Sequence, residues 1–364
     1  MRKYFLFGIL FLFAVLSLTT LRSIVPNLLY KQTISFALAF VVFFIAYRLP
    51  FAFHVKVSKW LYLLLNLSLL FLLIYGSITR GISAWIVLPF NFKFQPSQLA
   101  VPITALYLIN FLKKEQTFSW TLLLQTLSII ALPAILILLE PDFGTVLVFS
   151  VALSIFLFFN RLKFKQLMAL FFIGCLVLMT LWFLVFKDYQ KNRILGFLHL
   201  HQTSIDLQAT SQETSSAYNA RQALIAVGSG QFWGRGIGQG VQSHLRFLPE
   251  RQTDFIFASF AEEWGFVGAI FLLILYFLLL FFLLYLAYKV DNFGEKLYLL
   301  VLFTMFLIQI FINIGMNLAI LPITGITLPF LSYGGSSVIS LFFALGVAQS
   351  IATNFKKKAN FIFY

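Results

Sequence analysis

The chain has 364 residues, of which 61% are hydrophobic and only 10% are charged. Soluble domains carry about 25% charged residues, so this composition, with its 47 Phe, excludes a water-soluble globular protein. In a soluble protein the net charge of +14 would indicate nucleic-acid binding. In so apolar a chain we expect the basic residues to mark membrane topology instead, with membrane lipids and no nucleic acid as partners.

A membrane-spanning helix needs about 20 mostly apolar residues. Ten segments approach this length, at residues 4–21, 33–47, 60–76, 99–112, 120–139, 145–160, 166–186, 265–288, 297–320 and 336–355. Arg2 and Lys3 precede the first segment as in a signal peptide, but no small-residue cleavage site follows, so we expect this helix to be retained. The sequence predicts an all-α integral membrane protein of ten transmembrane helices, forming a single polytopic domain over residues 1–364.

Lysine and arginine are unevenly distributed between the two sides of these spans, and cytoplasmic loops are the ones that carry such an excess. With the N-terminus in the cytoplasm, the inner segments hold 15 of the 26 basic residues and the short outer loops hold four. Nine of the 12 acidic residues then lie on the outer side. We therefore expect both termini in the cytoplasm, and any chemistry that needs carboxylates on the extracytoplasmic face.

Cysteine and histidine give no sign of a disulfide framework or a structural metal site. The single Cys175 lies inside an apolar run, and a lone thiol cannot form an internal disulfide. The four histidines lack metal-ligand spacing; they are His54, His199, His201 and His244. We assign no metal ligand from the sequence.

Residues 187–255 contain no span, and we expect them to form one long extracytoplasmic loop between the seventh and eighth spans. Loops of this length are usually functional or disordered. Residues 220–227 predict a short helix, and six glycines then punctuate residues 228–240. No Gly-Lys-Ser/Thr follows them, so this is not a Walker loop. Glycine alternation alone is equally compatible with close packing on the membrane surface.

The segment 248–257 follows, and Thr253 or Asp254 is expected to cap a helix that continues into the eighth span. At 100° per residue, Glu262 flanks the side of this helix that carries Asp254, whereas Glu263 points to the opposite side. Small residues line the Asp254 side, where they admit a neighbouring helix or a ligand; they are Ala258, Ala261, Gly265 and Gly268. Two interpretations remain open: a simple N-cap with a headgroup contact, or functional carboxylates at membrane depth.

Two other outer segments and one polar repeat complete the candidates. Residues 140–145 separate the fifth and sixth spans with two acids, and residues 328–337 open the tenth span. The start of that helix is either an anion site or a Ser-capped turn without a ligand. Polar side chains recur every four residues in the ninth span, and we interpret them as interhelical hydrogen-bonding groups; they are Gln309, Asn313 and Asn317.

The motifs LPERQTDFIFASFAEEWGFVGA (248–269) and LPITGITLPFLSYGGSS (321–337) together resemble the SEDS family, the shape, elongation, division and sporulation proteins. EPDFGT (140–145), GSGQFWGRGIGQG (228–240) and FQPSQLA (94–100) add to the resemblance, which spans essentially the whole chain. IGMN (314–317) and LPER (248–251) make the chain more similar to the RodA branch than to the FtsW branch.

This resemblance implies a peptidoglycan glycosyltransferase of the bacterial cytoplasmic membrane that polymerises lipid II on the outer face, with a class B penicillin-binding protein as partner. The family's essential aspartate corresponds to Asp254, the expected general base. A divalent cation such as Mg²⁺ or Mn²⁺ would shield the pyrophosphate leaving group. The candidate substrate-binding residues are Arg246, Glu250, Arg251, Glu262, Arg221, Arg235, Asp142, Ser332, Gly334, Gly335, Ser336 and Ser337.

The sequence departs from the family pattern at several positions. Gln252 stands where the family usually has His, Gln98 and Val101 replace a Glu and a Lys, and Glu140 replaces the commoner Gln. Ser83 and Ala84 replace two arginines. The alternatives are a flippase for lipid-linked sugars, a non-enzymatic scaffold for the penicillin-binding protein, and an enzyme acting on another polyprenyl-linked sugar.

Overall fold

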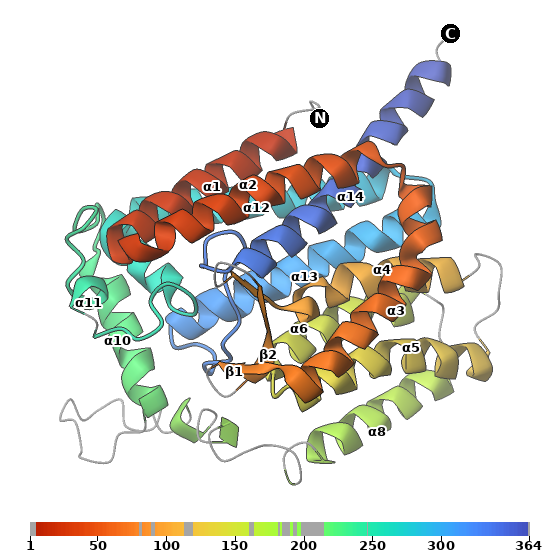
Figure 1. The fold of residues 1–364 in the computed structure, drawn as a ribbon, viewed down its shortest axis with the longest axis horizontal. Coiled ribbons are helices and arrows are strands. Elements are labelled where there is room, and N and C mark those ends of the chain that lie inside the picture. The colour runs from red at the N-terminus through yellow and green to blue at the C-terminus, as the bar shows by residue number, and fades with distance from the viewer. Residues whose placement is uncertain are drawn as a thin grey trace. The chain divides into compact units, whose positions relative to one another are not determined.

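The computed structural model describes residues 5–79, 82–88, 92–112, 119–159, 164–180, 183, 190–191, 195–197, 215–245 and 247–362. These residues are predominantly helical (Figure 1). Seven of the described helices are long and apolar enough to cross a membrane. They are α1 (Phe5–Ile24), α2 (Pro26–Arg48), α3 (Phe51–Tyr75), α5 (Trp120–Leu139), α12 (Ile256–Lys289), α13 (Phe293–Asn317) and α14 (Gly335–Ile362).

Helices also occupy the positions of the other three predicted spans, but they are shorter. These are α4 (Ala100–Phe111), α6 (Phe143–Leu153) with the adjoining α7 (Ile155–Phe159), and α8 (Phe164–Thr180). Their individual lengths of 5 to 17 residues fall below the roughly 20 residues of a full crossing. The all-α membrane fold is confirmed, whereas the number of ten spans stays a prediction.

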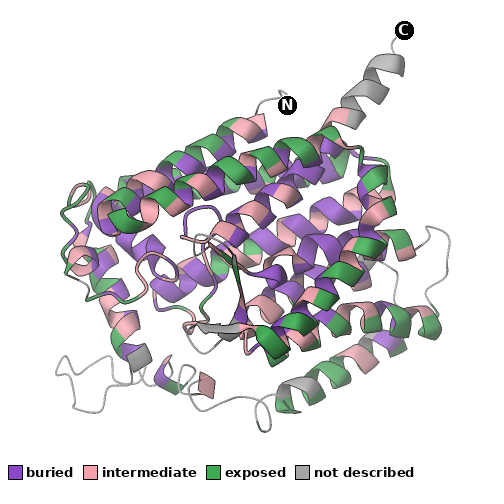
Figure 2. Cartoon of the chain, viewed as in Figure 1, coloured by how far each residue is buried: buried purple, intermediate pink, exposed green. Residues whose placement is uncertain are grey.

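Large apolar side chains are exposed along several of the long helices. On α3 they include Leu63, Leu64 and Leu67, which are 48%, 65% and 54% exposed, and on α5 they include Leu124 at 63%. Figure 2 shows such exposed positions on the outer sides of both helices. Because a soluble protein rarely exposes apolar patches of this extent, these are the sides that we expect to face lipid.

The chain divides into two compact units, each described by itself below. The first unit comprises Met1–Leu157, Leu272–Ile310 and Pro329–Tyr364. The second comprises Phe158–Phe271 and Phe311–Leu328. The predicted organisation as one polytopic domain, with residues 187–255 as an extracytoplasmic loop, stays a prediction.

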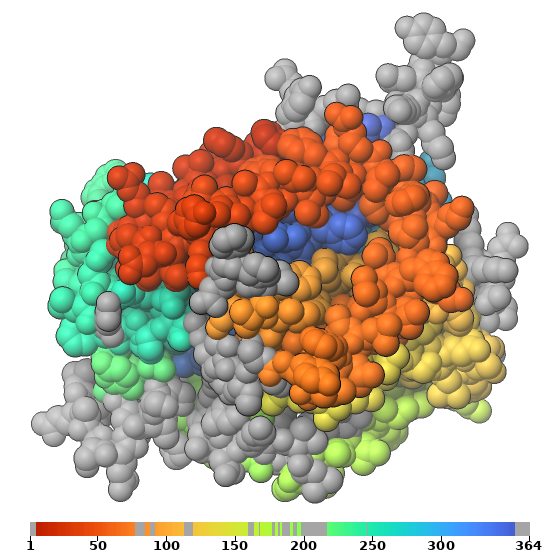
Figure 3. Space-filling model, viewed as in Figure 1, coloured from red at the N-terminus to blue at the C-terminus, as the bar shows by residue number. Residues whose placement is uncertain are grey.

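In the first unit, α14 packs closely against α2. A Cβ atom at Gly346 would lie 2.7 Å from the Phe43 carbonyl oxygen and 2.8 Å from the Ala46 Cβ, so this approach requires glycine. Figure 3 shows the blue atoms of α14 between those of α2 and those of α3 and α4. Close by, the Phe330 ring lies 5.2 Å from Phe13 and 5.5 Å from Phe306 between centroids. This packing fixes the chain just before α14 begins.

A small antiparallel sheet, which the sequence analysis did not predict, lies between α3 and α4 in the chain. Its order is β1-β2-β3, formed by β1 (Ser77–Thr79), β2 (Ile82–Leu88) and β3 (Phe92–Phe94). β2 pairs with β1 through Ser77 and Trp85, and with β3 through Ile86 and Phe94. β2 is rich in β-branched and aromatic residues, which favour strands. The sheet leads directly into a 3₁₀ turn, η2 (Pro96–Leu99), and α4.

The second unit contains α10 (Ser215–Ser229), α11 (Val241–His244) and the first part of α12. α10 confirms the helix predicted at residues 220–227 and extends it at both ends. Small and apolar side chains pack α10 against the start of α12; the buried members are Ala223, Ala226, Leu248, Phe255 and Ala258, with Val227 and Ile323 packed against them.

The first part of α12 is interrupted at Gly265, whose φ of 67° and ψ of −166° are not helical. A continuous helix from Asp254 into the eighth span was therefore a wrong expectation, as was the single straight stripe of small residues along it. The positive φ is readily adopted only by glycine. The interruption changes the direction of α12 at the point where residues 228–240 pack against it. We call residues 228–240 the glycine-rich loop.

Candidate active site

Asp254 lies at the end of a tight turn, residues 249–255, that leads into α12. Within this turn Glu250 has a positive φ of 48°. Its carboxylate Oε2 accepts hydrogen bonds from Gln252 Nε2 and Thr253 Oγ1, each at 3.2 Å. Because α12 begins at Ile256, neither Thr253 nor Asp254 occupies the capping position that was predicted. The side chain of Asp254 is partly exposed.

Two asparagines of α13 hold the backbone of Asp254. Its carbonyl oxygen accepts hydrogen bonds from Asn313 Nδ2 at 3.1 Å and from Asn317 Nδ2 at 3.0 Å. Asn317 Oδ1 in turn accepts the backbone N–H of Ala258 at 3.0 Å. Both asparagines are fully buried. The first turn of α12 is thus capped by a side chain from another helix, and the predicted interhelical role of this pair is confirmed.

Glu262 is fully buried and holds α11 in place. Its carboxylate accepts the backbone N–H groups of Gln242 at 2.8 Å and Ser243 at 3.0 Å, and the Ser243 hydroxyl at 2.6 Å. Charged acceptors make stronger hydrogen bonds than neutral ones, so Glu262 fixes this segment firmly. The geometry gives Glu262 a positioning role, and its predicted contact with substrate stays a prediction.

Glu263 reaches the same part of the chain as Glu262. Its Oε1 accepts the N–H of Gly238 at 3.2 Å and lies 3.1 Å from His244 Nε2. Glu262 and Glu263 therefore contact neighbouring parts of the chain, although their directions on the helix differ by about 100°. The physical reason is that the glycine-rich loop and α11 wrap around this part of α12, so that side chains leaving the helix in different directions meet them.

The glycine-rich loop fills the space beside the small residues of α12. Arg235 and Gly236 donate backbone hydrogen bonds to the carbonyl oxygens of Glu262 and Glu263, at 3.0 and 3.1 Å. A Cβ atom at Gly230 would lie 2.1 Å from the Ala261 carbonyl oxygen, and one at Gly234 would lie 2.2 Å from that of Glu263. The small residues of α12 were expected to admit either a neighbouring segment or a ligand, and in this structure they admit the glycine-rich loop.

The predicted phosphate-binding arginines differ in their surroundings. Arg251 is partly buried and donates from Nη1 to the Ser243 carbonyl oxygen, which ties the Asp254 turn to α11. Arg221 lies partly buried on α10, and Arg235 is exposed on the glycine-rich loop. Arg246 lies outside the described residues. The second unit therefore brings Asp254, Glu250 and Arg251 into one turn, with Glu262 supporting that turn through α11.

In the first unit, Asp142 caps α6 at the turn after α5. Its carboxylate accepts the N–H and hydroxyl of Thr145, at 3.1 and 2.7 Å, and Gln95 Nε2 at 2.8 Å. Burial raises the pKa of Asp142, while these hydrogen bonds lower it. Asp142 is thus fully engaged by protein groups in this structure.

Glu140, two residues earlier, is a buried carboxyl group in a different situation. It is 0% exposed, and neither carboxylate oxygen has a hydrogen-bond partner among the described residues. Burial, and secondarily the charge of Asp142, raises the pKa of Glu140 to about 8. A charged carboxylate without a partner is costly to bury, so this side chain is neutral at pH 7.

The segment before α14 is held by the first two helices. Gln32 accepts the N–H of Gly334 at 3.3 Å and donates to the Ser332 carbonyl oxygen at 3.4 Å. Ser332 and Ser336 are buried, whereas the other candidates of this segment are partly buried; these are Gly334, Gly335 and Ser337. One N–H group at the start of α14 is therefore already used within the protein. The predicted anion-binding role of this segment stays a prediction.

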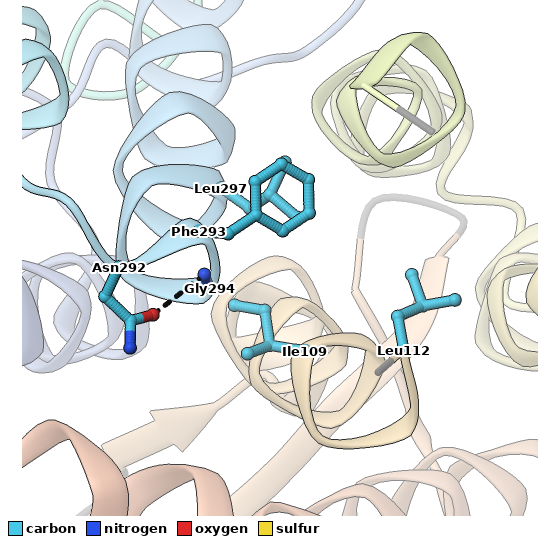
Figure 4. Close-up of a pocket in the computed structure, with 6 residues that line it drawn as sticks. All are labelled: Ile109, Leu112, Asn292, Phe293, Gly294 and Leu297. Carbon is cyan, nitrogen blue, oxygen red and sulfur yellow. Dashed lines mark hydrogen bonds between the residues drawn. The ribbon is translucent and has the colours of Figure 1, made fainter. Parts of the chain in front are cut away.

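Figure 4 shows a pocket of about 230 Å³ in the first unit, at the beginning of α13. Asn292 Oδ1 accepts the N–H groups of Gly294 and Glu295 there, at 2.9 and 3.2 Å. Most of the lining is apolar, and none of the predicted site residues takes part; it consists of Ile109, Leu112, Asn292, Phe293, Gly294 and Leu297. The pocket is thus separate from the candidate active site.

Comparison with known proteins decides the family. The chain matches the cell cycle protein family of FtsW, RodA and SpoVE over residues 2–357. It belongs to this family. It is 32% identical over 327 residues to the peptidoglycan glycosyltransferase MrdB of Escherichia coli K12, covering 88% of this chain and 84% of that protein.

Two solved structures are also similar to this family member. One is a chain of a peptidoglycan synthase complex that coordinates polymerisation and crosslinking, with a TM-score of 0.78, 29% identity, and coverage of 97% of this chain and 98% of that one. The other is the rod shape determining protein RodA of Thermus thermophilus, with a TM-score of 0.70, 27% identity and 96% coverage of each chain. The family predicted from the motifs is confirmed, and the chain is a multi-pass bacterial membrane protein.

Two of this family member's departures from the usual pattern, Gln98 and Val101, lie in η2 and at the start of α4. Gln98 donates from Nε2 to Gln95 Oε1 at 3.3 Å, and Gln95 in turn contacts Asp142. Val101, where the family usually has Lys, is only 4% exposed on α4. A neutral amide chain and a buried apolar side chain therefore occupy the positions where the family pattern places an acid and a base.

Two features of the site escaped sequence reasoning. The four-residue spacing of Asn313 and Asn317 indicated interhelical contacts, but not that both would meet at the Asp254 carbonyl oxygen. The complete burial of Glu140 was indicated only weakly in the sequence, by its position directly after an apolar run and before Pro141.

Proposed function

We propose that this protein is a peptidoglycan glycosyltransferase that polymerises lipid II, an undecaprenyl-pyrophosphate disaccharide-pentapeptide, into glycan strands for cell elongation and shape. Family membership supports the proposal, because a 32% identical relative is named for this activity. The observation that carries it is the geometry of Asp254. Two buried asparagine side chains hold its backbone carbonyl oxygen in place, while its own side chain is partly exposed. A general base needs such placement, since proton abstraction requires hydrogen-bond reach.

In the proposed reaction, the 4-hydroxyl of the acceptor sugar attacks the anomeric carbon of the donor. The new C–O bond forms as the bond from that carbon to the pyrophosphate oxygen breaks, and the lipid pyrophosphate leaves with the electron pair. Asp254 accepts the hydroxyl proton, a contribution typically worth roughly 10²–10⁴-fold in rate. A single displacement of this kind inverts the anomeric configuration.

The pyrophosphate needs positive charge and hydrogen-bond donors. We assign this role to Arg251 of the Asp254 turn, to Arg246 earlier in the sequence, and to Arg221 and Arg235, because a guanidinium group matches phosphate oxygens in a bidentate geometry. In the first unit, the N–H groups of residues 334–337 and the positive end of the α14 dipole are further candidates for binding an anion. Glu250 shapes the turn through its contacts with Gln252 and Thr253.

A divalent cation, Mg²⁺ or Mn²⁺, would supply charge stabilisation at the leaving pyrophosphate. Within the described ranges, however, no three His, Cys, Asp or Glu side chains come together as potential ligands. The described residues therefore offer no dedicated cage for the cation.

We further propose that both termini lie in the cytoplasm, which places residues 187–255 and the Asp254 turn on the outer face of the cytoplasmic membrane. The excess of Lys and Arg in the segments assigned to the inner side supports this orientation. A class B penicillin-binding protein is the proposed partner, since a structurally similar chain belongs to a complex that joins polymerisation with crosslinking.

The test is polymerisation of labelled lipid II by the purified protein, with and without the partner. Asp254→Asn should abolish glycan formation, whereas Asp291→Asn, a matched change at an exposed aspartate between α12 and α13, should leave it intact. Full polymerisation by Asp254→Asn would refute the assignment of the base.

Two other outcomes would identify the rival functions. Exchange of lipid II between leaflets without any glycan product would make the protein a flippase. Complete cell-shape rescue by an Asp254→Asn variant that still binds the penicillin-binding protein would make it a scaffold. Polymerisation of another polyprenyl-linked sugar in preference to lipid II would change the substrate and leave the chemistry as proposed.

A further inference from the structure

The glycine-rich loop exposes a group of large apolar side chains. Trp233 is 77% exposed, Ile237 is 58% exposed and Phe232 is 54% exposed. Single exposed apolar residues are common on proteins, but three on one short loop form a patch. A patch of this kind marks a surface that something else covers.

The patch is presented by a rigid backbone. Gln231 and Phe232 accept hydrogen bonds from the N–H groups of Phe266 and Val267, at 2.9 and 3.2 Å. On the other side of Trp233, the N–H of Arg235 donates to the Glu262 carbonyl oxygen at 3.0 Å. The backbone is therefore fixed to α12 on both sides of Trp233, and the exposure of this side chain is built into the fold.

The patch is continuous with an apolar side of α12. The rings of Phe232 and Phe266 stack with their centroids 5.9 Å apart, and those of Phe232 and Trp233 meet edge to face at 5.1 Å. From Phe266 onwards, α12 exposes further apolar residues at helical spacing, among them Ile270 at 39% and Phe271 at 43%. This helix is long and apolar enough to cross a membrane, so we expect its exposed apolar side to face acyl chains.

The chemistry of the loop matches the boundary between lipid tails and headgroups. Trp is enriched at this boundary because its ring is apolar and its N–H is polar. Arg235, two residues after Trp233, is exposed, and a guanidinium group binds the phosphate of a lipid headgroup well. Aromatic rings next to an arginine, at the end of an apolar helix side, form a typical interfacial anchor.

We propose that the glycine-rich loop lies in the lipid headgroup region, with Phe232 and Trp233 inserted at the boundary with the acyl chains and Arg235 at the level of the headgroup phosphates, where the pyrophosphate of a lipid substrate would also lie. The occupant is the bilayer itself, in the leaflet where α12 begins. The inference does not depend on the proposed glycosyltransferase activity, because it rests on the exposed side chains and on the lipid-facing side of α12.

Depth-dependent fluorescence quenching tests the proposal. In a Cys175→Ser background, Trp233→Cys is labelled with the environment-sensitive dye NBD and reconstituted into phosphatidylcholine–phosphatidylglycerol vesicles. The vesicles carry nitroxide at the headgroup, at acyl carbon 5 or at acyl carbon 12. Two matched sites serve as controls: Gln239→Cys, exposed at the other end of the loop, and Phe271→Cys, which lies about 7.5 Å further along α12 than Phe266 at 1.5 Å per residue.

We expect the label at position 233 to lose fluorescence most with headgroup and carbon-5 nitroxides, and the label at 271 most with the carbon-12 nitroxide. The label at 239 should be quenched chiefly by aqueous iodide. If Trp233→Cys does not fold, as judged by its thermal transition, Ile237→Cys takes its place.

Equal iodide quenching at 233 and 239, with no effect of any lipid nitroxide, would overturn the proposal. Shielding at 233 that arises only after a partner protein is added would also overturn it, because the patch would then be a protein interface. A loss of shallow quenching at position 233 in Arg235→Gln, with the yield of reconstitution and the quenching at position 271 unchanged, would support the headgroup contact.

Discussion

Replacing Asn317 tests whether the position of Asp254 is set by α13. Asn317→Leu keeps the number and branching of the side-chain heavy atoms but removes the donor to the Asp254 carbonyl oxygen and the acceptor for the Ala258 N–H. A buried N–H left without a partner costs about 1–3 kcal/mol, and a lost hydrogen bond about 0.5–1.5 kcal/mol. We therefore expect a stability loss of about 2–4 kcal/mol, seen as a lower thermal midpoint in detergent.

The rate of polymerisation should fall as well as the stability. A displacement of about 1 Å at a reacting group can cost on the order of 10²-fold in rate. We expect kcat for lipid II polymerisation to fall by about 10- to 100-fold at temperatures where the variant is still folded, with little change in KM. The assay is single-turnover polymerisation below the thermal midpoint, measured beside the parent protein.

Two variants separate positioning from folding. Asn313→Leu removes the other donor to the Asp254 carbonyl oxygen and leaves the Asn317 cap of the Ala258 N–H in place, so it should lower kcat with a smaller loss of stability. Gln309→Leu changes the same helix two turns before Asn317, where the buried Oε1 has no partner among the described residues, and should alter neither. Full kcat in both asparagine variants, or an equal loss in Gln309→Leu, would refute the positioning role.

Three further predictions concern the support of the site. Glu262→Ala should lower the free energy of unfolding by at least about 3 kcal/mol, since it leaves two buried N–H groups without a charged acceptor; limited proteolysis near α11 measures the loosening, and an unchanged pattern would contradict it. Gly234 has a φ of 82°, and a Cβ atom there would lie 2.2 Å from the Glu263 carbonyl oxygen, so Gly234→Ala should lower the free energy of unfolding by at least about 1–3 kcal/mol. A Cβ atom at Gly228 would have nothing within 4 Å, so Gly228→Ala should be neutral or mildly stabilising. Thermal melting of the two variants measures the difference. Because the pKa of Glu140 is raised to about 8 from an ordinary 4.5, the folded state binds the extra proton, and stability should fall as pH rises from about 4.5 to about 8, by up to about 1.4 kcal/mol per unit. Glu140→Gln should remove this slope, and a slope equal to the parent's in a pH series of thermal midpoints would contradict the assignment.

The membrane fold follows from the sequence because long apolar runs have few alternatives in a bilayer. The predicted span 120–139 has the same bounds as α5, and those of α12 to α14 differ mainly at the ends. The strands at residues 77–94 were missed because a short apolar stretch beside two long spans gives a weak periodic signal. The interruption at Gly265 was missed for a related reason: a glycine within a helical pattern does not reveal whether it is helical.

The candidate site was predictable in its residues and less so in its geometry. Asp254 and the arginines around it came from local motifs, but the partners of Asp254 lie 59 and 63 positions away in the sequence. Glu262 and Glu263 occupy adjacent positions with different helical directions, yet both meet one loop. Such contacts depend on which distant segments of the chain pack against α12, and local sequence patterns and helix propensities do not specify that packing.

The cap that Asn317 gives to Ala258 has a consequence for the order of assembly. The chain is synthesised from the N-terminus, so the Asp254 turn and the start of α12 emerge long before the last residues of α13. Until α13 is complete, the Ala258 N–H and the Asp254 carbonyl oxygen lack the partners that fix them. The body of α12 can enter the membrane on its own apolar character, but the turn that carries Asp254 takes its final shape only after the next helix has been added.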